Sequence, residues 1–161
     1  MKCFKDSTGR EWTIEITIAT VKRVESLADV NLVRLIQPRS GATGSLLTEL
    51  QTDIVLFCDV LYAAMKPQAD ERGLTDETFA AVLAGQVIAD ATVAFWDELM
   101  LFFRSLPTGQ ATVAAIMKAK ELVKAAVERA VSKIETLTLG DSAGSSPESL
   151  ESTRVVSPSV N

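Results

Sequence analysis

Two adjacent stretches carry the most regular hydrophobic pattern of the chain. Residues 76–83 and 87–103 each predict a helix, with Ala84-Gly85-Gln86 as the link between them. Within 87–103 the apolar residues form two neighbouring stripes that together cover about 200° of the helix circumference. The first contains Ile88, Ala91, Phe95, Leu99 and Phe102, and the second contains Val93, Trp96, Met100 and Phe103. A single core-facing side does not need so wide an arc, so this helix either lies deep in its own domain or binds a partner on one side.

The remaining pattern predicts a hairpin and further helices. Period-2 alternation over Glu11–Ile18, after a turn that ends at Gly9, predicts a β-hairpin over residues 2–18. Helices are expected over about residues 20–28, 46–65 and 109–137, with a fresh N-cap at Thr52-Asp53 and another at Thr75. Three segments are connections: residues 30–35 are a short strand or an extended connector, and Gln37–Ser45 and Lys66–Gly73 are loops.

These elements predict an α+β fold that is mostly α. The N-terminal hairpin is expected to pack on a bundle of four to five helices, because a two-stranded hairpin is marginal alone. Residues 1–139 are expected to form a single globular domain, and the Ser/Pro-rich residues 140–161 a disordered tail. The expected core consists of Phe57, Leu61, Phe79, Leu83, Phe95, Leu99, Val123 and Val127.

Composition and length place the chain among globular proteins. It has 161 residues, of which 47% are hydrophobic and 23% charged, enough for one domain with a core. Asp90, Asp97 and Glu98 interrupt the longest apolar stretch, so no membrane span is predicted. The N-terminus turns polar after four residues, without the apolar region of a secretory signal. Cys3 and Cys58 are too few and too far apart for a disulfide scaffold or zinc site. A cytoplasmic location is therefore expected.

The charge is uneven along the chain and argues against nucleic acid as a partner. The net charge is −5, and residues 41–104 carry three basic against ten acidic residues, a net −7. Phosphate binding needs clustered Lys and Arg, which this acidic middle lacks. A solvated acidic face is the simpler interpretation, and a contact between unlike charged surfaces is the alternative.

Candidate catalytic chemistry is sparse. The chain contains no His, the commonest general base and metal ligand. Four acids, Asp70, Glu71, Asp76 and Glu77, flank Gly73 and have the chemistry to chelate a hard cation, although a solvated loop before a helix N-terminus is the favoured interpretation. We therefore expect no enzyme activity, no cofactor and no metal. A small enzyme that uses these acids is the competing hypothesis.

Several groups of turn and core residues follow one another in a recognisable order. They are Phe4, Asp6, Gly9, Arg10 and Trp12; then Val60-Leu61-Tyr62 and Pro67; then the segment from Arg72 to Phe79, a Leu-Ala-Gly link and Phe102-Phe103. This order, over about residues 3–135, resembles small bacteriophage tail proteins, in particular the tail assembly chaperones usually encoded just before the tape measure protein. The motifs contain no catalytic signature.

The resemblance implies a non-enzymatic protein in the host cell cytoplasm. Its partner would be the long, apolar, helical tape measure protein, kept soluble until tail tube protein polymerises around it; contact with tail tube protein and homo-oligomers also fit this role. The residues expected to bind the partner are Trp96, Met100, Phe103 and Val93. The alternative is a structural virion component, such as a tail completion or connector subunit, or a phage helical protein of another role.

Overall fold

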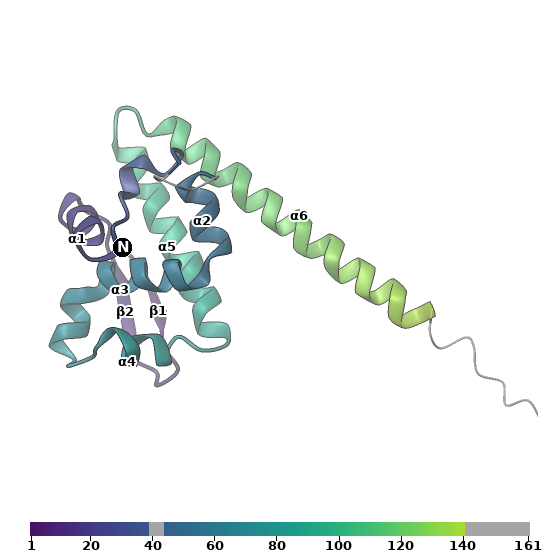
Figure 1. The fold of residues 1–161 in the computed structure, drawn as a ribbon, viewed down its shortest axis with the longest axis horizontal. Coiled ribbons are helices and arrows are strands. Elements are labelled where there is room, and N and C mark those ends of the chain that lie inside the picture. Colours follow the sequence, from purple (N-terminus) through teal and green to yellow (C-terminus); the bar gives the residue numbers. More distant parts are fainter. Residues whose placement is uncertain (39–43, 141–161) are drawn as a thin grey trace, which may run out of the picture. The chain divides into compact units, whose positions relative to one another are not determined.

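The computed structural model of the protein describes residues 1–38 and 44–140, with side chains as far as Lys133. Figure 1 shows the order of its elements. They are β1 (Lys2–Lys5), β2 (Glu11–Ile14), α1 (Ile18–Ala28), the 3₁₀ helix η1 (Leu32–Arg34), α2 (Leu46–Thr52), α3 (Ile54–Glu71), α4 (Asp76–Ala81), α5 (Gln86–Ser105) and α6 (Gln110–Gly140). The chain separates into two units, Met1–Leu122 and Val123–Asn161, and the division falls within α6.

The fold is mostly helical α+β, as predicted, with an antiparallel hairpin packed against helices. Lys2 pairs with Ile14 and Lys5 with Glu11, which puts Phe4, Trp12 and Ile14 on the buried side of the hairpin. The second strand is shorter than predicted. Thr17 accepts a hydrogen bond from the Thr20 N–H and so caps α1, which begins at Ile18.

The hairpin turn is organised by a buried carboxylate. Asp6 accepts hydrogen bonds from the backbone N–H groups of Thr8 and Arg10, at 2.9 and 3.0 Å, and from the indole N–H of Trp12 at 3.0 Å. Gly9 closes the turn at φ +84°, a conformation that side-chain-bearing residues rarely adopt. Burial alone would raise the pKa of Asp6, but hydrogen bonds from Thr8, Trp12 and Arg10 outweigh it and lower the pKa to about 2.

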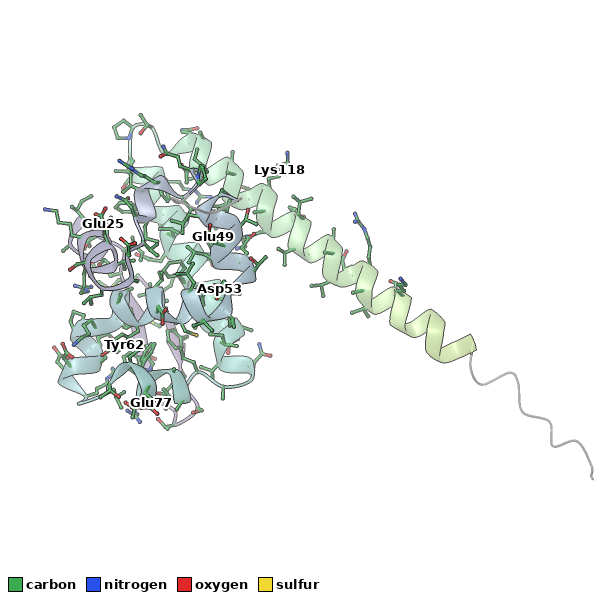
Figure 2. The ribbon with its side chains drawn as sticks, in the orientation of Figure 1. Glu25, Glu49, Asp53, Tyr62, Glu77 and Lys118 are labelled. Atoms are coloured by element: carbon green, nitrogen blue, oxygen red, sulfur yellow. The ribbon has the colours of Figure 1, made fainter. Side chains whose placement is uncertain are left out.

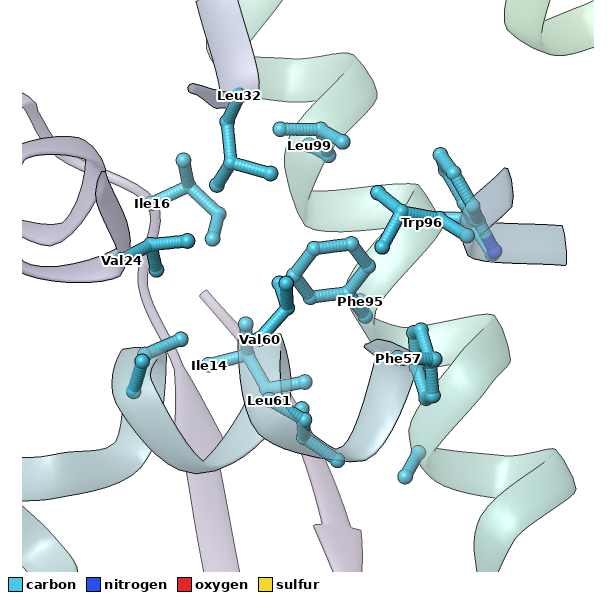
Figure 3. Close-up of a cluster of buried hydrophobic side chains, with 14 of the residues drawn as sticks. Ile14, Ile16, Val24, Leu32, Phe57, Val60, Leu61, Phe95, Trp96 and Leu99 are labelled. Atoms are coloured by element: carbon cyan, nitrogen blue, oxygen red, sulfur yellow. The ribbon is translucent and has the colours of Figure 1, made fainter. Parts of the chain in front are cut away.

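The core of the first unit is formed by the hairpin, helices α1 to α5 and the first turns of α6, and Figure 3 shows part of it. The rings of Phe57 and Phe95 meet edge to face with centroids 5.4 Å apart, and those of Trp12 and Phe79 with centroids 4.9 Å apart. Six predicted core residues are buried and confirmed: Phe57, Leu61, Phe79, Leu83, Phe95 and Leu99.

The prediction of Val123 and Val127 as core residues was wrong. These side chains are 48% and 56% exposed, whereas Val113 and Ile116, earlier on the same apolar stripe of α6, are buried. Periodicity identifies the apolar side of a helix but does not determine which turns of that side another element covers.

The break between α2 and α3 is confirmed. Asp53 accepts hydrogen bonds from the N–H groups of Val55 and Leu56, both at 3.0 Å, and so caps the new helix. Asp53 lies at the start of α3 in Figure 2. Thr75 caps α4 in the same way, with a reciprocal bond from its own N–H to the Thr78 hydroxyl at 2.8 Å.

The predicted loop over Lys66–Gly73 was wrong, because α3 continues through Pro67 to Glu71. Proline has no N–H, so the Ala63 carbonyl four residues earlier loses its helical partner. The guanidinium of Arg23 in α1 supplies the missing donor: Nε lies 2.8 Å from the Ala63 oxygen and Nη2 2.9 Å from the Ala64 oxygen. A contact between helices therefore permits what the local sequence disfavours.

The remaining connections differ in part from expectation. Residues 30–35 form neither a strand nor an extended connector, since Asn31 caps the η1 turn by accepting from the Val33 N–H. Within the predicted loop Gln37–Ser45, Pro38 and Ser45 form an isolated antiparallel bridge, and residues 39–43 lie outside the described part. Most of the predicted tail, residues 141–161, also lies outside it.

Candidate partner-binding surface

The four residues predicted to bind a partner divide between the core and the surface. Trp96 and Phe103 are buried, with 4% and 2% of their surfaces exposed, and Trp96 lies among core side chains in Figure 3. Met100 is half-buried and Val93 is 57% exposed. Trp96 and Phe103 therefore fill the core of the folded chain, and of the four predicted residues only Val93 and Met100 reach its surface.

Helix geometry explains this division. At about 100° per residue, Val93 and Met100 lie about 60° further around α5 than Trp96 and Phe103. Phe95 and Leu99 mark the centre of the buried side. The wide apolar arc of α5 therefore extends past the edge of the core, and the half-buried Met100 lies at the boundary between the core and the surface.

Met100 lines a groove between the end of α5 and the start of α6. The groove is lined by Met100 and Arg104 of α5 and by Met117, Lys118, Lys120 and Glu121 of α6, and it has a volume of about 330 Å³. A cavity of about 150 Å³ accommodates benzene, so this space has room for about two large apolar side chains. We call it the methionine groove.

The turn between α5 and α6 fixes the two walls of the methionine groove. The N–H of Leu106 donates to Phe103 and that of Gly109 to Leu106, at 3.0 and 3.1 Å. A Cβ atom on Gly109 would lie 1.7 Å from the Phe103 carbonyl oxygen, so only glycine fits there. Beyond the turn, Val113 and Ile116 are buried, which anchors the first turns of α6.

An ion pair crosses from one wall to the other. Lys120 Nζ lies 3.1 Å from a carboxylate oxygen of Asp97, whose other oxygen lies 3.9 Å from Lys2. Among the described residues, no ion pair joins Arg104 or Lys118 to a carboxylate. Lys118 is labelled near the start of α6 in Figure 2. The charged lining therefore contains three cations and one anion, Glu121, in a chain whose net charge is −5.

A second hollow, between α1, α3 and α4, is acidic. It has a volume of about 500 Å³, and its lining includes Asp29, Asp59, Tyr62 and Asp76. Burial raises the pKa of Asp59, and the nearby carboxylates of Asp76 and Asp53 raise it further. Figure 2 shows Tyr62 on α3.

The acids predicted as a potential cation site are not brought together as one. Asp70 forms an ion pair with Lys66 one turn earlier on α3, and Asp76 and Glu77 occupy the exposed first turn of α4. Among the side chains that the structure describes, in residues 1–38 and 44–133, no three His, Cys, Asp or Glu residues are placed to hold a metal ion. Cys58 is half-buried on α3, and burial followed by the negative charges of Asp59 and Asp76 raises the pKa of its thiol.

Sequence reasoning found Met100 but missed most of the methionine groove. Met117 lies beside the Val113–Ile116 stripe, and this position was a usable signal that a second methionine borders the buried face. The pairing of α5 with the start of α6 depends on the 105–109 turn, which the sequence marks only as a stop.

Comparison with known proteins found no matching family model, no matching curated protein and no matching solved structure. The class that the structure defines is a mostly helical α+β protein with an N-terminal hairpin. In the described part of the chain, no helix combines the length and the apolar character needed to cross a membrane.

Proposed function

We propose that the protein binds an apolar helical segment of another protein in the methionine groove, as a non-enzymatic tail assembly chaperone for a phage tape measure protein. The observation that carries the proposal is the groove itself. Met100 and Met117 line it from two helices, beside residues that both helices bury in the core: Phe103 on α5, and Val113 and Ile116 on α6. An apolar hollow between helices is a usual receptor for the apolar side of a third helix.

The methionines suit a partner that presents many similar segments. Methionine is unbranched and polarizable, so a methionine-lined surface adapts to side chains of different shape. A tape measure protein is long, apolar and helical, so one binding surface would have to accept successive, non-identical stretches of it. The sequence resemblance to tail assembly chaperones supports the same partner, and the net charge of −5 supports a role in keeping an apolar partner soluble.

Co-expression with the tape measure protein of the same genome tests the proposal. The full chain should raise the soluble yield of that protein, and the exposed methionine variant Met117→Lys should abolish most of the gain. The matched control is Val55→Lys, because Val55 is an exposed apolar residue on α3 that does not line the methionine groove. An unchanged tape measure yield with the natural chain, or equal loss with both variants, would reject the proposal.

The location of the protein in finished particles separates the chaperone from the alternative role. A chaperone should be absent from purified particles, whereas a tail completion or connector subunit should be present in a fixed ratio to other tail proteins. Quantitative mass spectrometry of particles therefore decides between these two roles.

A further inference from the structure

We infer that the methionine groove prefers apolar helical segments flanked by acidic residues. This inference rests on the proposed function and adds the chemical character of the partner. The lining of the methionine groove has a net positive charge. Of its six described residues, three are cations and one is an anion. By contrast, residues 41–104 taken together carry a net −7.

The three cations do not have equal roles. Lys120 is engaged by Asp97 at 3.1 Å and so belongs to the contact between α5 and α6. Arg104 and Lys118 have no such partner among the described carboxylates, and they lie on opposite walls. A segment seated over Met100 and Met117 would therefore have one cation on each side of its apolar face.

The chemistry of this arrangement selects for carboxylates. An apolar face placed between the methionines removes water from the groove, and a Glu or Asp beside that face would meet Arg104 or Lys118 at reduced solvent screening. A Lys or Arg at the same place would meet a like charge instead, which disfavours binding. Among the described residues that line the groove, Glu121 is the only acid, and it offsets one of these cations. The preference is therefore for flanks that carry a few acidic residues rather than many.

The inference is tested by measuring how tightly the full chain binds two helical peptides of about 20 residues. Both peptides carry the same Leu stripe, which is flanked by Glu in one peptide and by Lys in the other. Titration calorimetry at low salt should show the Glu-flanked peptide binding about tenfold more tightly, and the difference should shrink as salt screens the charges. In the double variant Arg104→Glu with Lys118→Glu, the preference should reverse.

The control double variant is Lys5→Glu with Lys22→Glu. It changes the net charge equally at exposed residues that do not line the methionine groove, and it should keep the original preference. Circular dichroism checks that each variant is folded. Equal binding of the two peptides, a preference for the Lys-flanked peptide, or equal effects of both double variants would overturn the inference.

Failure of this inference is distinguishable from failure of the proposed function. If neither peptide binds but the tape measure protein is still solubilised in a manner that depends on Met117, the charge preference is wrong and the chaperone role stands. If solubilisation also fails, both are wrong.

Discussion

Arg23 supplies the hydrogen bond that Pro67 withholds from its own helix. Its Nε lies 2.8 Å from the carbonyl oxygen of Ala63, the group that the residue at position 67 would otherwise bond through its N–H. Helix α3 therefore remains continuous through a proline because α1 lies beside it. This relationship also fixes α1 on the helix that carries Phe57 and Leu61 into the core.

Replacing Arg23 by Met should lower the free energy of unfolding by about 1.5–3 kcal/mol, the usual range for hydrogen bonds to a charged group. In a Pro67→Ala background the Arg23→Met replacement should lower the free energy of unfolding by less, because an alanine at position 67 donates its own N–H to the Ala63 carbonyl. Urea denaturation of the four proteins of this cycle measures the coupling. Strictly additive effects would show that Arg23 does not compensate for Pro67.

The buried carboxylate of Asp6 should make the free energy of unfolding depend on pH in the acidic range. Its pKa is lowered from 3.8 to about 2 in the folded protein, so its contribution is present in full above about pH 5 and is lost as pH falls through 3.8 towards 2. The shift corresponds to about 2 kcal/mol. Asp6→Asn should remove about this much stability at pH 7, and its deficit relative to the natural chain should narrow at pH 3.

Urea denaturation at pH 7, 4 and 3 checks this behaviour. Asp90→Asn, which makes the same charge change at an exposed residue of α5, is the control and should stay within about 0.5 kcal/mol of the natural chain. A deficit for Asp6→Asn that is unchanged between pH 7 and pH 3 would contradict the role given to the carboxylate.

The turn between α5 and α6 should not tolerate a side chain at Gly109. Gly109→Ala places a Cβ atom 1.7 Å from the Phe103 carbonyl oxygen, so the backbone of the turn must shift. We expect a loss of about 1–3 kcal/mol, as for other overpacked sites. Gly44→Ala is the control, because its nearest contact is an ordinary 3.7 Å to Thr48 and little change is expected. Thermal unfolding compares the two, and equal melting temperatures would contradict the described turn.

The division of α5 into a core edge and a surface edge is tested by truncation. Trp96→Ala should cost about 3–5 kcal/mol because Trp96 is buried, whereas Val93→Ala should stay within about 0.5 kcal/mol. Both variants shorten an apolar side chain of the same predicted stripe. If urea denaturation shows similar losses of stability for Trp96→Ala and Val93→Ala, the boundary between the buried and exposed sides of α5 does not lie between these two residues.

The sequence predicted the parts of this fold that depend on local chemistry. The caps at Asp53 and Thr75 and the hairpin turn around Gly9 follow from side chains that bond to their own neighbouring backbone, and the alternation at Trp12 and Ile14 marks a strand with one buried side. The hydrophobic pattern likewise identified Phe57, Phe95 and Leu99 as core.

The errors arose where a distant contact decides the outcome. The helix through Pro67 depends on Arg23, which lies 40 residues before the carbonyl that its guanidinium bonds. The inward position of Trp96 and the outward position of Met100 depend on where neighbouring elements end, which a helical wheel does not contain. For the same reason the sequence does not indicate which residues of α6 line the groove together with Met100.

The central claim is that the methionine groove receives an apolar helical segment, and methionine methyl NMR tests it most directly. The chain has four methionines, so ¹³C-methyl labelling gives four signals: Met100 and Met117 in the groove, and Met1 and the buried Met65 as internal references. On titration with helical segments of the tape measure protein, the account predicts saturable shifts of the Met100 and Met117 methyl signals, with those of Met1 and Met65 unchanged. Binding that leaves the Met100 and Met117 signals in place would contradict it.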